Sequence, residues 1–203
     1  KSYEGYALFI TKKGTVKKTK LEEYSNERQN GIRAITLDEG DEVINVLRTN
    51  GTNEILLATK QGQAVRCNEN NIRDMGRTAT GVRGIWLQEN DAVIGAELAQ
   101  PGTTILTVTE LGYGKRSPIE DYRLTNRGGS GVINIKITEK NGPVAAITTV
   151  TEDEEVLFMT TQGQAIRVPV NNISSIGRNT QGVRIMRLND KDKVNTIAKI
   201  GKE

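Results

Sequence analysis

The chain of 203 residues contains no histidine and a single cysteine, Cys67. These absences exclude a disulfide within the chain, a Cys/His zinc site and an imidazole base, and with them most hydrolase and metalloenzyme mechanisms. Aromatic residues make up only 4% of the chain, and their pattern does not predict the stacking platform of a single-strand nucleic-acid binder.

Long apolar runs are also lacking, since none approaches the roughly 18 residues of a membrane span. The first residues, Lys1-Ser-Tyr-Glu4, include neither a signal-peptide core nor an initiator methionine, so we expect a soluble piece of a longer chain. The unpaired cysteine is typical of a reducing compartment and predicts a cytoplasmic protein with no membrane partner. With 28 Lys plus Arg against 25 Asp plus Glu the net charge is only +3, so bulk charge indicates no particular partner.

An internal repeat runs through the whole chain. Its first landmark is the motif Thr-x-x-Gly, which ends at Gly14, Gly62, Gly112 and Gly163. Its second landmark is a glycine followed by Ile or Val, at Gly31, Gly81, Gly131 and Gly182. We call these the first and the second glycine of each repeat. The spacings of 48 to 51 residues predict a single repeat domain over 1–203, with blades at approximately 1–51, 52–101, 102–152 and 153–203.

Each repeat contains short β-rich runs between turn signals, at 6–11, 16–21, 32–37 and 43–48 in the first repeat. No segment of 10 or more residues has a helical period. Four strands per unit of about 50 residues predict an all-β, propeller-like fold whose four-stranded blades pack on their neighbours. We expect an open, incomplete ring, because closed rings usually have more than four blades. The first glycines are predicted to serve hairpin geometry, since no phosphate-loop motif occurs.

Basic residues keep the same phase as the glycines. The residue four places after the first glycine is basic in every repeat: Lys18, Arg66, Arg116 and Arg167. Four places before the second glycine stand Arg77, Arg127 and Arg178, with Arg28 one place off in the first repeat. Two places after it stand Arg33, Arg83 and Arg184, where the third repeat has Ile133. Lys17 and Lys115 precede members of the first series and complete the thirteen candidate residues.

The symmetry of repeated blades places equivalent residues at equal steps around the assembly, so we expect a curved row of cations. Such a row fits a bent polyanion, and duplex DNA carries a charge about every 1.7 Å that Lys and Arg neutralise with little regard to sequence. We therefore predict that these thirteen residues contact the phosphates of duplex DNA. For any single residue the alternative is a solvated loop charge or a partner of a nearby carboxylate.

Four motifs spread over the repeats resemble the C-terminal domain of the DNA gyrase A subunit. They are Met75-Gly-Arg-Thr-Ala79, Gly112-Tyr-Gly-Lys-Arg116, Thr138-Glu-Lys-Asn-Gly142 and Ile176-Gly-Arg-Asn-Thr-Gln-Gly182. The related domain of the topoisomerase IV A subunit is the near alternative. The resemblance covers essentially the whole chain and implies a β-pinwheel whose blades exchange strands and whose rim wraps duplex DNA. About six blades are usual in that family, so four repeats correspond to a part of the domain.

The resemblance also implies a role: a non-sequence-specific DNA-wrapping module that supports ATP-dependent negative supercoiling by the whole enzyme. Its partners would be duplex DNA, the rest of the A subunit, and the B subunit in a heterotetramer on the bacterial chromosome. Cleavage, ATP and Mg belong to other parts of that enzyme, so we expect no catalytic residue, cofactor, metal or small-molecule substrate here. The family's box, Gln-Arg-Arg-Gly-Gly-Lys-Gly, has only a degenerate counterpart in Arg127-Gly-Gly-Ser-Gly131.

Two other functions are compatible with a propeller. One is a protein-interaction scaffold, in which the basic row pairs with acidic side chains or an acidic partner. The other is a propeller enzyme with paired carboxylates. The sequence gives the enzyme little support, because acidic clusters such as Glu152-Asp-Glu-Glu155 are typical of solvated hairpin tips.

Overall fold

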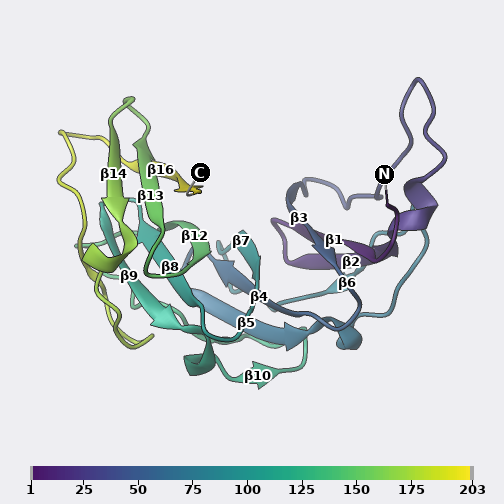
Figure 1. Ribbon diagram of the computed structural model, residues 1–203, viewed down its shortest axis with the longest axis horizontal. Coiled ribbons are helices and arrows are strands. Elements are labelled where there is room, and N and C mark those ends of the chain that lie inside the picture. The colour runs from purple at the N-terminus through teal and green to yellow at the C-terminus, as the bar shows by residue number, and fades with distance from the viewer. Residues whose placement is uncertain (1, 202–203) are drawn as a thin grey trace.

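Four small sheets form an open arc in the computed structural model, which describes residues 2–201 (Figure 1). We call these sheets blades 1 to 4, in chain order. Blade 1 and blade 4 stand at opposite ends of the arc, and the open side lies between them (Figure 1). The predicted all-β, propeller-like architecture with an open ring is confirmed.

The blades share one strand order. Blade 1 contains β3 (Val43–Thr49), β1 (Tyr6–Thr11), β2 (Thr15–Lys20) and β6 (Val82–Arg83). Blade 2 contains β7 (Val93–Leu98), β4 (Glu54–Thr59) and β5 (Gln63–Asn68), with both β10 (Leu124–Thr125) and β11 (Val132–Ile133) on β5. Blade 3 contains β12 (Val144–Val150), β8 (Thr104–Thr109), β9 (Tyr113–Pro118) and β15 (Val183–Arg184). Blade 4 contains β16 (Val194–Ile200), β13 (Glu155–Thr160) and β14 (Ala165–Pro169). Short 3-10 turns follow β2, β5, β9 and β14, at Leu21–Tyr24, Glu69–Asn71, Ile119–Asp121 and Val170–Asn172.

Strand exchange joins successive blades. The short strand β6 lies in the second repeat but pairs with β2 of the first, and β11 and β15 pair in the same way with β5 and β9. This confirms the exchange that the family resemblance implies. The prediction of a strand at 32–37 within its own blade is wrong, because the described chain holds no preceding repeat whose edge this segment could join. Within residues 2–201, β14 likewise receives no donated strand.

The repeated glycines make this exchange possible. All four first glycines have φ between 84° and 88°, which confirms their predicted role in hairpin geometry. The carbonyl of Gly14 then accepts the backbone N–H of Gly84 in the donated segment at 2.8 Å. At the second glycine, Gly81, a Cβ atom would lie 2.4 Å from the carbonyl oxygen of Val16. Only glycine therefore lets the donated strand approach so closely.

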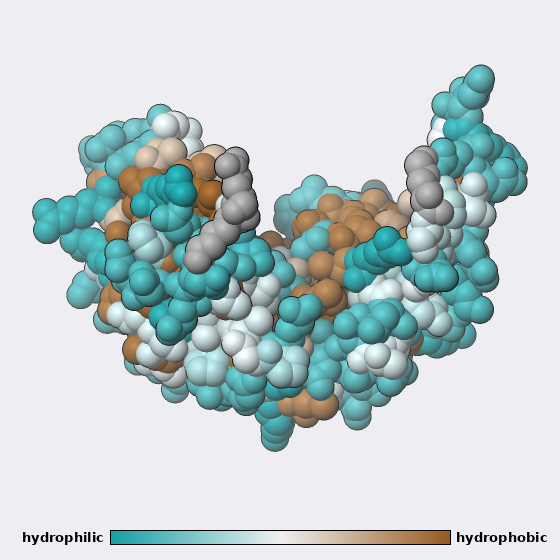
Figure 2. All heavy atoms as spheres, viewed as in Figure 1, coloured by the Kyte–Doolittle hydropathy of each residue, from teal (hydrophilic) through white to brown (hydrophobic). Residues whose placement is uncertain are grey.

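The hydrophobic core consists of three clusters, each between two neighbouring blades. Leu8 and Val16 of blade 1 pack with Leu57 of blade 2, and equivalent clusters fill the next two interfaces. An internal blade is covered on both faces, so consecutive residues of a central strand such as β4 are all buried apart from the first. Hydrophobic residues gather toward the middle of the arc, whereas most of its convex side is hydrophilic, apart from a hydrophobic patch at the bottom of the view (Figure 2).

Candidate nucleic-acid interface

Lys115 lies inside the molecule with no exposed surface. Its Nζ donates to the hydroxyl of Ser117 at 2.8 Å and to the carbonyls of Asn134, Arg178 and Gly177 at 2.6, 3.0 and 3.2 Å. Burial, helped by the guanidinium of Arg178, lowers the pKa of Lys115 to about 7. Because this amine is enclosed by oxygens of two repeats, it joins them. The prediction that it contacts phosphate is corrected.

Lys17 occupies the equivalent place in blade 1 and is also fully buried. Its Nζ bonds the hydroxyl of Tyr24 at 3.2 Å and the carbonyls of Ala34 and Arg77, and it lies 5.0 Å from the ring centroid of Phe9. Burial lowers the pKa of Lys17 to about 8. This lysine joins the first repeat to the second, so its assignment as a phosphate contact is corrected as well.

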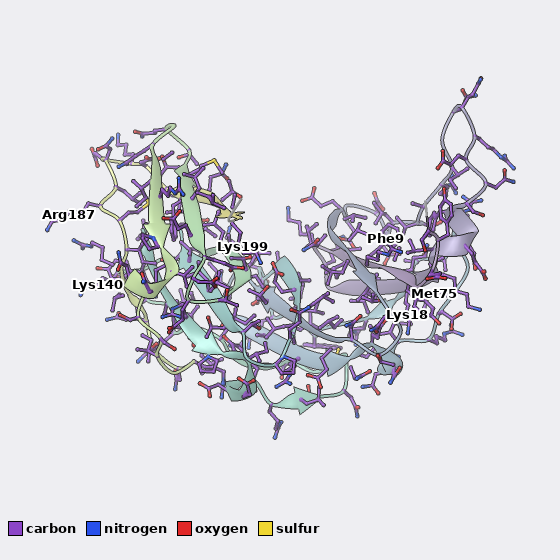
Figure 3. All side chains as sticks on the ribbon, viewed as in Figure 1. Phe9, Lys18, Met75, Lys140, Arg187 and Lys199 are labelled. Carbon is purple, nitrogen blue, oxygen red and sulfur yellow. The ribbon has the colours of Figure 1, made fainter. Side chains whose placement is uncertain are left out.

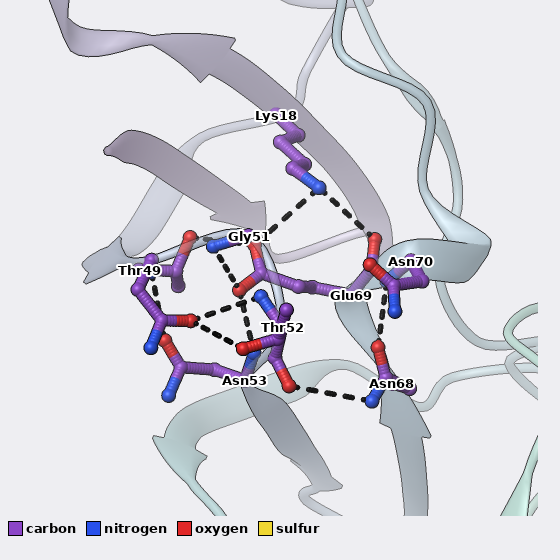
Figure 4. A network of polar contacts seen from close by, with 9 residues as sticks. Lys18, Thr49, Gly51, Thr52, Asn53, Asn68, Glu69 and Asn70 are labelled. Atoms are coloured by element: carbon purple, nitrogen blue, oxygen red, sulfur yellow. Dashed lines mark hydrogen bonds and ion pairs between the residues drawn. The ribbon is translucent and has the colours of Figure 1, made fainter. Parts of the chain in front are cut away.

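Lys18, the first member of the series four places after the first glycine, is 5% exposed and faces Glu69 of the next repeat (Figure 4). Its Nζ lies 3.5 Å from Oε2 of Glu69 and 3.3 Å from that residue's carbonyl oxygen. The fully buried carboxylate of Glu69 also accepts the hydroxyl of Thr49 at 2.6 Å and the N–H groups of Gly51 and Asn53 at 2.8 and 2.7 Å. Lys18 therefore neutralises a buried carboxylate. The prediction that it contacts phosphate is corrected.

Arg66 and Arg116 continue this series and reach the 3-10 turn of the following blade. Arg66 donates to Oε2 of Glu54 at 2.8 Å and to the carbonyl of Tyr122 at 3.1 Å. Arg116 is 5% exposed and donates to the carbonyl of Ile173 at 2.8 Å. Both guanidiniums bridge two blades, so their prediction as phosphate contacts is corrected for the same physical reason.

The arginines four places before the second glycine are half-buried clamps: Arg77, Arg127 and Arg178. Arg127 donates from Nε to the carbonyl of Asn71 at 2.9 Å and from a terminal nitrogen to the carbonyl of Arg83 at 3.0 Å. Arg77 and Arg178 make the second of these bonds to the carbonyls of Arg33 and Ile133. Arg127 and Arg178 thus hold the donated strands β6 and β11 of the preceding repeat, whereas Arg77 holds the equivalent segment of the first repeat, which forms no strand.

Five of the thirteen candidate residues are exposed: Arg28, Arg33, Arg83, Arg167 and Arg184. Arg83 stacks on the ring of Trp86, with its Cζ 4.2 Å from the ring centroid. Arg184 donates to the hydroxyl of Tyr113 at 3.1 Å. Arg167 pairs with Glu155 but keeps 61% of its side chain exposed, because no blade follows it within residues 2–201. These guanidiniums can reach a ligand in solvent.

The sequence analysis missed a further pair of exposed cations that occupy equivalent positions in two repeats. Lys136 and Arg187 stand five places after the second glycine, where the second repeat has Trp86. Arg187, which follows β15 at the edge of blade 3, projects from the convex side, whereas Lys199 on β16 of blade 4 projects toward the inner side of the arc (Figure 3). Counting basic residues at a fixed distance from the second glycine, as for the other series, would have found these two at a distance of five residues. We call the exposed cations that follow the second glycine the outer-rim cations: Arg33, Arg83, Lys136, Arg184 and Arg187.

Side chains that bind metal ions do not cluster in the part of the chain that the structure describes. No three His, Cys, Asp or Glu side chains there lie close enough together to hold a metal ion. Burial raises the pKa of the Cys67 thiol to about 11, so that thiol is not activated. Nor is any helix of residues 2–201 long and apolar enough to cross a bilayer.

The family described as "DNA gyrase C-terminal domain, beta-propeller" matches the chain four times, at residues 5–50, 53–100, 103–151 and 154–200. The chain belongs to this family. The DNA gyrase A subunit of Streptococcus pyogenes serotype M1 is 60% identical over 196 residues, which are 97% of this chain and 24% of that protein. The gyrase A subunit of Halalkalibacterium halodurans is 55% identical over 195 residues, 96% of this chain and 23% of that protein. The gyrase family domain described here thus spans about a quarter of these relatives.

Solved structures of the family have the same fold. The C-terminal domain of DNA topoisomerase IV superposes with a TM-score of 0.92 at 25% identity, over 98% of this chain and 63% of that one. The DNA gyrase A C-terminal domain superposes with a TM-score of 0.88 at 25% identity, over 98% of this chain and 66% of that one. The resemblance drawn from the sequence motifs is confirmed.

Proposed function

We propose that this chain binds duplex DNA along the convex side of its arc and holds it in a bend, as part of the A subunit of a DNA gyrase. The observation that carries the proposal is the set of outer-rim cations, which are exposed and recur at equivalent positions in successive blades. Relatives of up to 60% identity that are named as the A subunit of DNA gyrase support the choice of enzyme.

The physical argument rests on repetition. Bending 20 to 30 base pairs of DNA by 40 to 90° costs of order 1 to 6 kcal/mol. One phosphate contact cannot offset that cost, whereas cations carried by each successive blade can do so together. Such contacts release counterions from the DNA and are made to the backbone rather than to base edges. Binding is therefore strong at low salt and independent of sequence.

In the whole enzyme this part would present a bent segment of duplex to the gate that cleaves DNA, and so support negative supercoiling. Cleavage, ATP hydrolysis and the Mg that goes with it belong to the B subunit or to other parts of the A subunit. The chain itself acts by binding alone, with no cofactor or small-molecule substrate, on chromosomal DNA in the bacterial cytoplasm.

The loop that resembles the family's glycine-rich box contributes indirectly. The N–H of Gly128 donates to the carbonyl of Gly84 at 2.7 Å, and the carbonyl of Gly129 accepts the N–H of Trp86 at 2.9 Å. Arg127 grips the carbonyl of Arg83. The loop is thus engaged with the preceding repeat. We assign it the task of holding Arg83 on the rim rather than contacting phosphate itself.

The A subunit of topoisomerase IV is the second candidate parent, since the topoisomerase IV domain has the higher TM-score of 0.92. The solved topoisomerase IV and gyrase A domains each share 25% identity with this chain, whereas the gyrase A subunit of Streptococcus pyogenes shares 60%. Sequence identity is the better guide to the parent enzyme, because both domains have one fold.

Binding of a fluorescent 40-base-pair duplex, measured by anisotropy at several salt concentrations, tests the proposal. The logarithm of the association constant should fall with the logarithm of the salt concentration, by roughly 0.9 for each phosphate contacted. Replacing Arg83 and Arg184 together by Glu should weaken binding at least tenfold at low salt, because two rim cations become anions.

The matched control replaces Arg48 and Lys199 by Glu, which changes the net charge equally. These two exposed residues occupy equivalent positions on the innermost strands, β3 and β16. The control should lose no more than about twofold in affinity, since its charges are on the concave side. Equal loss in the two double variants, or a flat salt response of the unmodified chain, would contradict the proposal and favour the protein scaffold.

A further inference from the structure

Trp86 is the single tryptophan of the chain, and 55% of it is exposed. Its neighbour Ile85 is 1% exposed and belongs to the core between blades 1 and 2. The positions equivalent to Trp86 in the next two repeats carry the outer-rim cations Lys136 and Arg187. The largest side chain of the molecule thus stands in solvent, at a position that carries a cation in the next two repeats and Thr36 in the first.

The side chain is also held in place. The guanidinium of Arg83 lies over the indole ring at 4.2 Å from its centroid. The backbone on both sides is fixed, since the N–H of Trp86 donates to Gly129 at 2.9 Å and the carbonyl of Arg83 accepts a bond from Arg127 at 3.0 Å. A rigid aromatic side chain loses little conformational entropy when it binds a ligand.

A flat ring beneath a guanidinium and beside further cations fits one chemical class of ligand: a nucleic acid, which offers phosphates next to flat bases and sugars. Proteins that bend duplex DNA place apolar side chains against the base steps of the minor groove, where unstacking eases the bend. An acidic protein partner would satisfy the cations but would offer nothing flat for the ring.

We propose that Trp86 is a wedge that contacts the minor groove of the bound duplex at the outer edge of blade 1, next to β6, with Arg83 holding the adjacent phosphate. The inference rests on the proposed function and adds a non-electrostatic contact to it. It makes the outer edge of blade 1 different from those of blades 2 and 3, where Lys136 and Arg187 occupy the equivalent position. The bend in the DNA should therefore be sharpest at the outer edge of blade 1.

The single tryptophan gives a direct readout. Titration of the chain with a 30-base-pair duplex should quench the indole fluorescence, with the same midpoint that anisotropy of labelled duplex gives. Heparin, which supplies charge without bases, should compete for the site but leave the indole emission close to that of the free chain.

Two variants distinguish the contribution of the Trp86 side chain to DNA affinity from the contribution of the cations. Trp86→Ala should lower the affinity for duplex roughly tenfold while the salt slope stays unchanged, because no cation is lost. Lys136→Ala, the matched control in the next blade, should reduce the slope by about 0.9 and the affinity by less. Both side chains are exposed, and the thermal midpoints of both variants should match that of the unmodified chain.

The outcomes distinguish the two proposals. Anisotropy that reports binding without any change in indole emission, or Trp86→Ala with unchanged affinity, would overturn the wedge and leave the proposed function standing. Heparin quenching equal to that of duplex would also overturn it. Absence of duplex binding by the unmodified chain at low salt would overturn both.

Discussion

Two rows of cations keep the same period along the chain but lie in different environments. Lys115 is enclosed by carbonyl oxygens between blades, whereas Arg184, one of the outer-rim cations, is exposed. Both recur because the blades recur, yet one row holds the arc together and the other is free to bind. Periodicity therefore shows that a residue belongs to the repeat, and only the direction of its side chain shows what it does.

The largest effect that separates the rows is expected from Lys115→Met, which keeps the volume of the side chain but removes its donors. The carbonyl of Asn134 and the other oxygens around Nζ lose their shared donor, which should cost about 2 to 3 kcal/mol of unfolding free energy. Denaturant unfolding measures this cost. The same change at the exposed Lys136 should alter stability by less than about 0.5 kcal/mol. A loss of similar size at both lysines would abolish the distinction.

A smaller effect on stability is expected at the clamps, which are intermediate in burial between the two rows. Arg178→Met removes bonds to the carbonyls of Asp121 and Ile133 at 2.7 and 2.5 Å. Because the site is half-buried and water can replace part of the donor, we expect a loss of about 1 to 2 kcal/mol. Affinity for duplex DNA, measured well below the unfolding temperature, should change less than twofold. A large loss of affinity with intact stability would place Arg178 in the rim row instead.

The buried row should also make stability depend on pH. The folded pKa of Lys115 is about 7, against 10.5 for the ordinary amine, so the unfolded chain binds more protons between these values. Stability should therefore rise with pH from about 7, by no more than about 1.4 kcal/mol per pH unit for one proton. Lys17, with a pKa of about 8, adds to the rise at higher pH. Denaturant unfolding from pH 7.0 to 8.5 tests this, and Lys115→Met should flatten the lower part of the curve. A stability that falls with pH would contradict it.

The smallest effect is expected for one rim cation. Arg33→Ala should leave the thermal midpoint unchanged within about 1 °C, since the side chain is exposed. It should reduce the salt slope of DNA binding by about 0.9, which is one phosphate contact. Anisotropy at several salt concentrations provides the slope. An unchanged slope would remove Arg33 from the outer-rim cations.

The architecture was predictable because glycine spacing and alternating turns are local signals. The first strand, at 6–11, was placed correctly, but the third strand of each repeat, which follows the second glycine, was assigned to the wrong blade because its hydrogen-bonding partner lies in another repeat. The buried lysines could not be predicted, because alternate side chains of a strand normally point to a face of the sheet that is exposed to solvent. In β2 the consecutive residues Lys17 and Lys18 are both buried, because neighbouring parts of the chain cover both faces of the strand.

Because each repeat donates a strand to the blade before it, the number of residues in such a repeat domain cannot change freely. A deletion within one repeat disrupts two sheets, because the repeat contributes strands to both. Deletion of the residues from one second glycine to the next removes one whole unit, so that every remaining donated strand still has a blade to pair with. Growth and shortening are therefore restricted to steps of one period, 50 or 51 residues here. The total angle through which a duplex can be turned would then come in increments, set by how many units the arc contains.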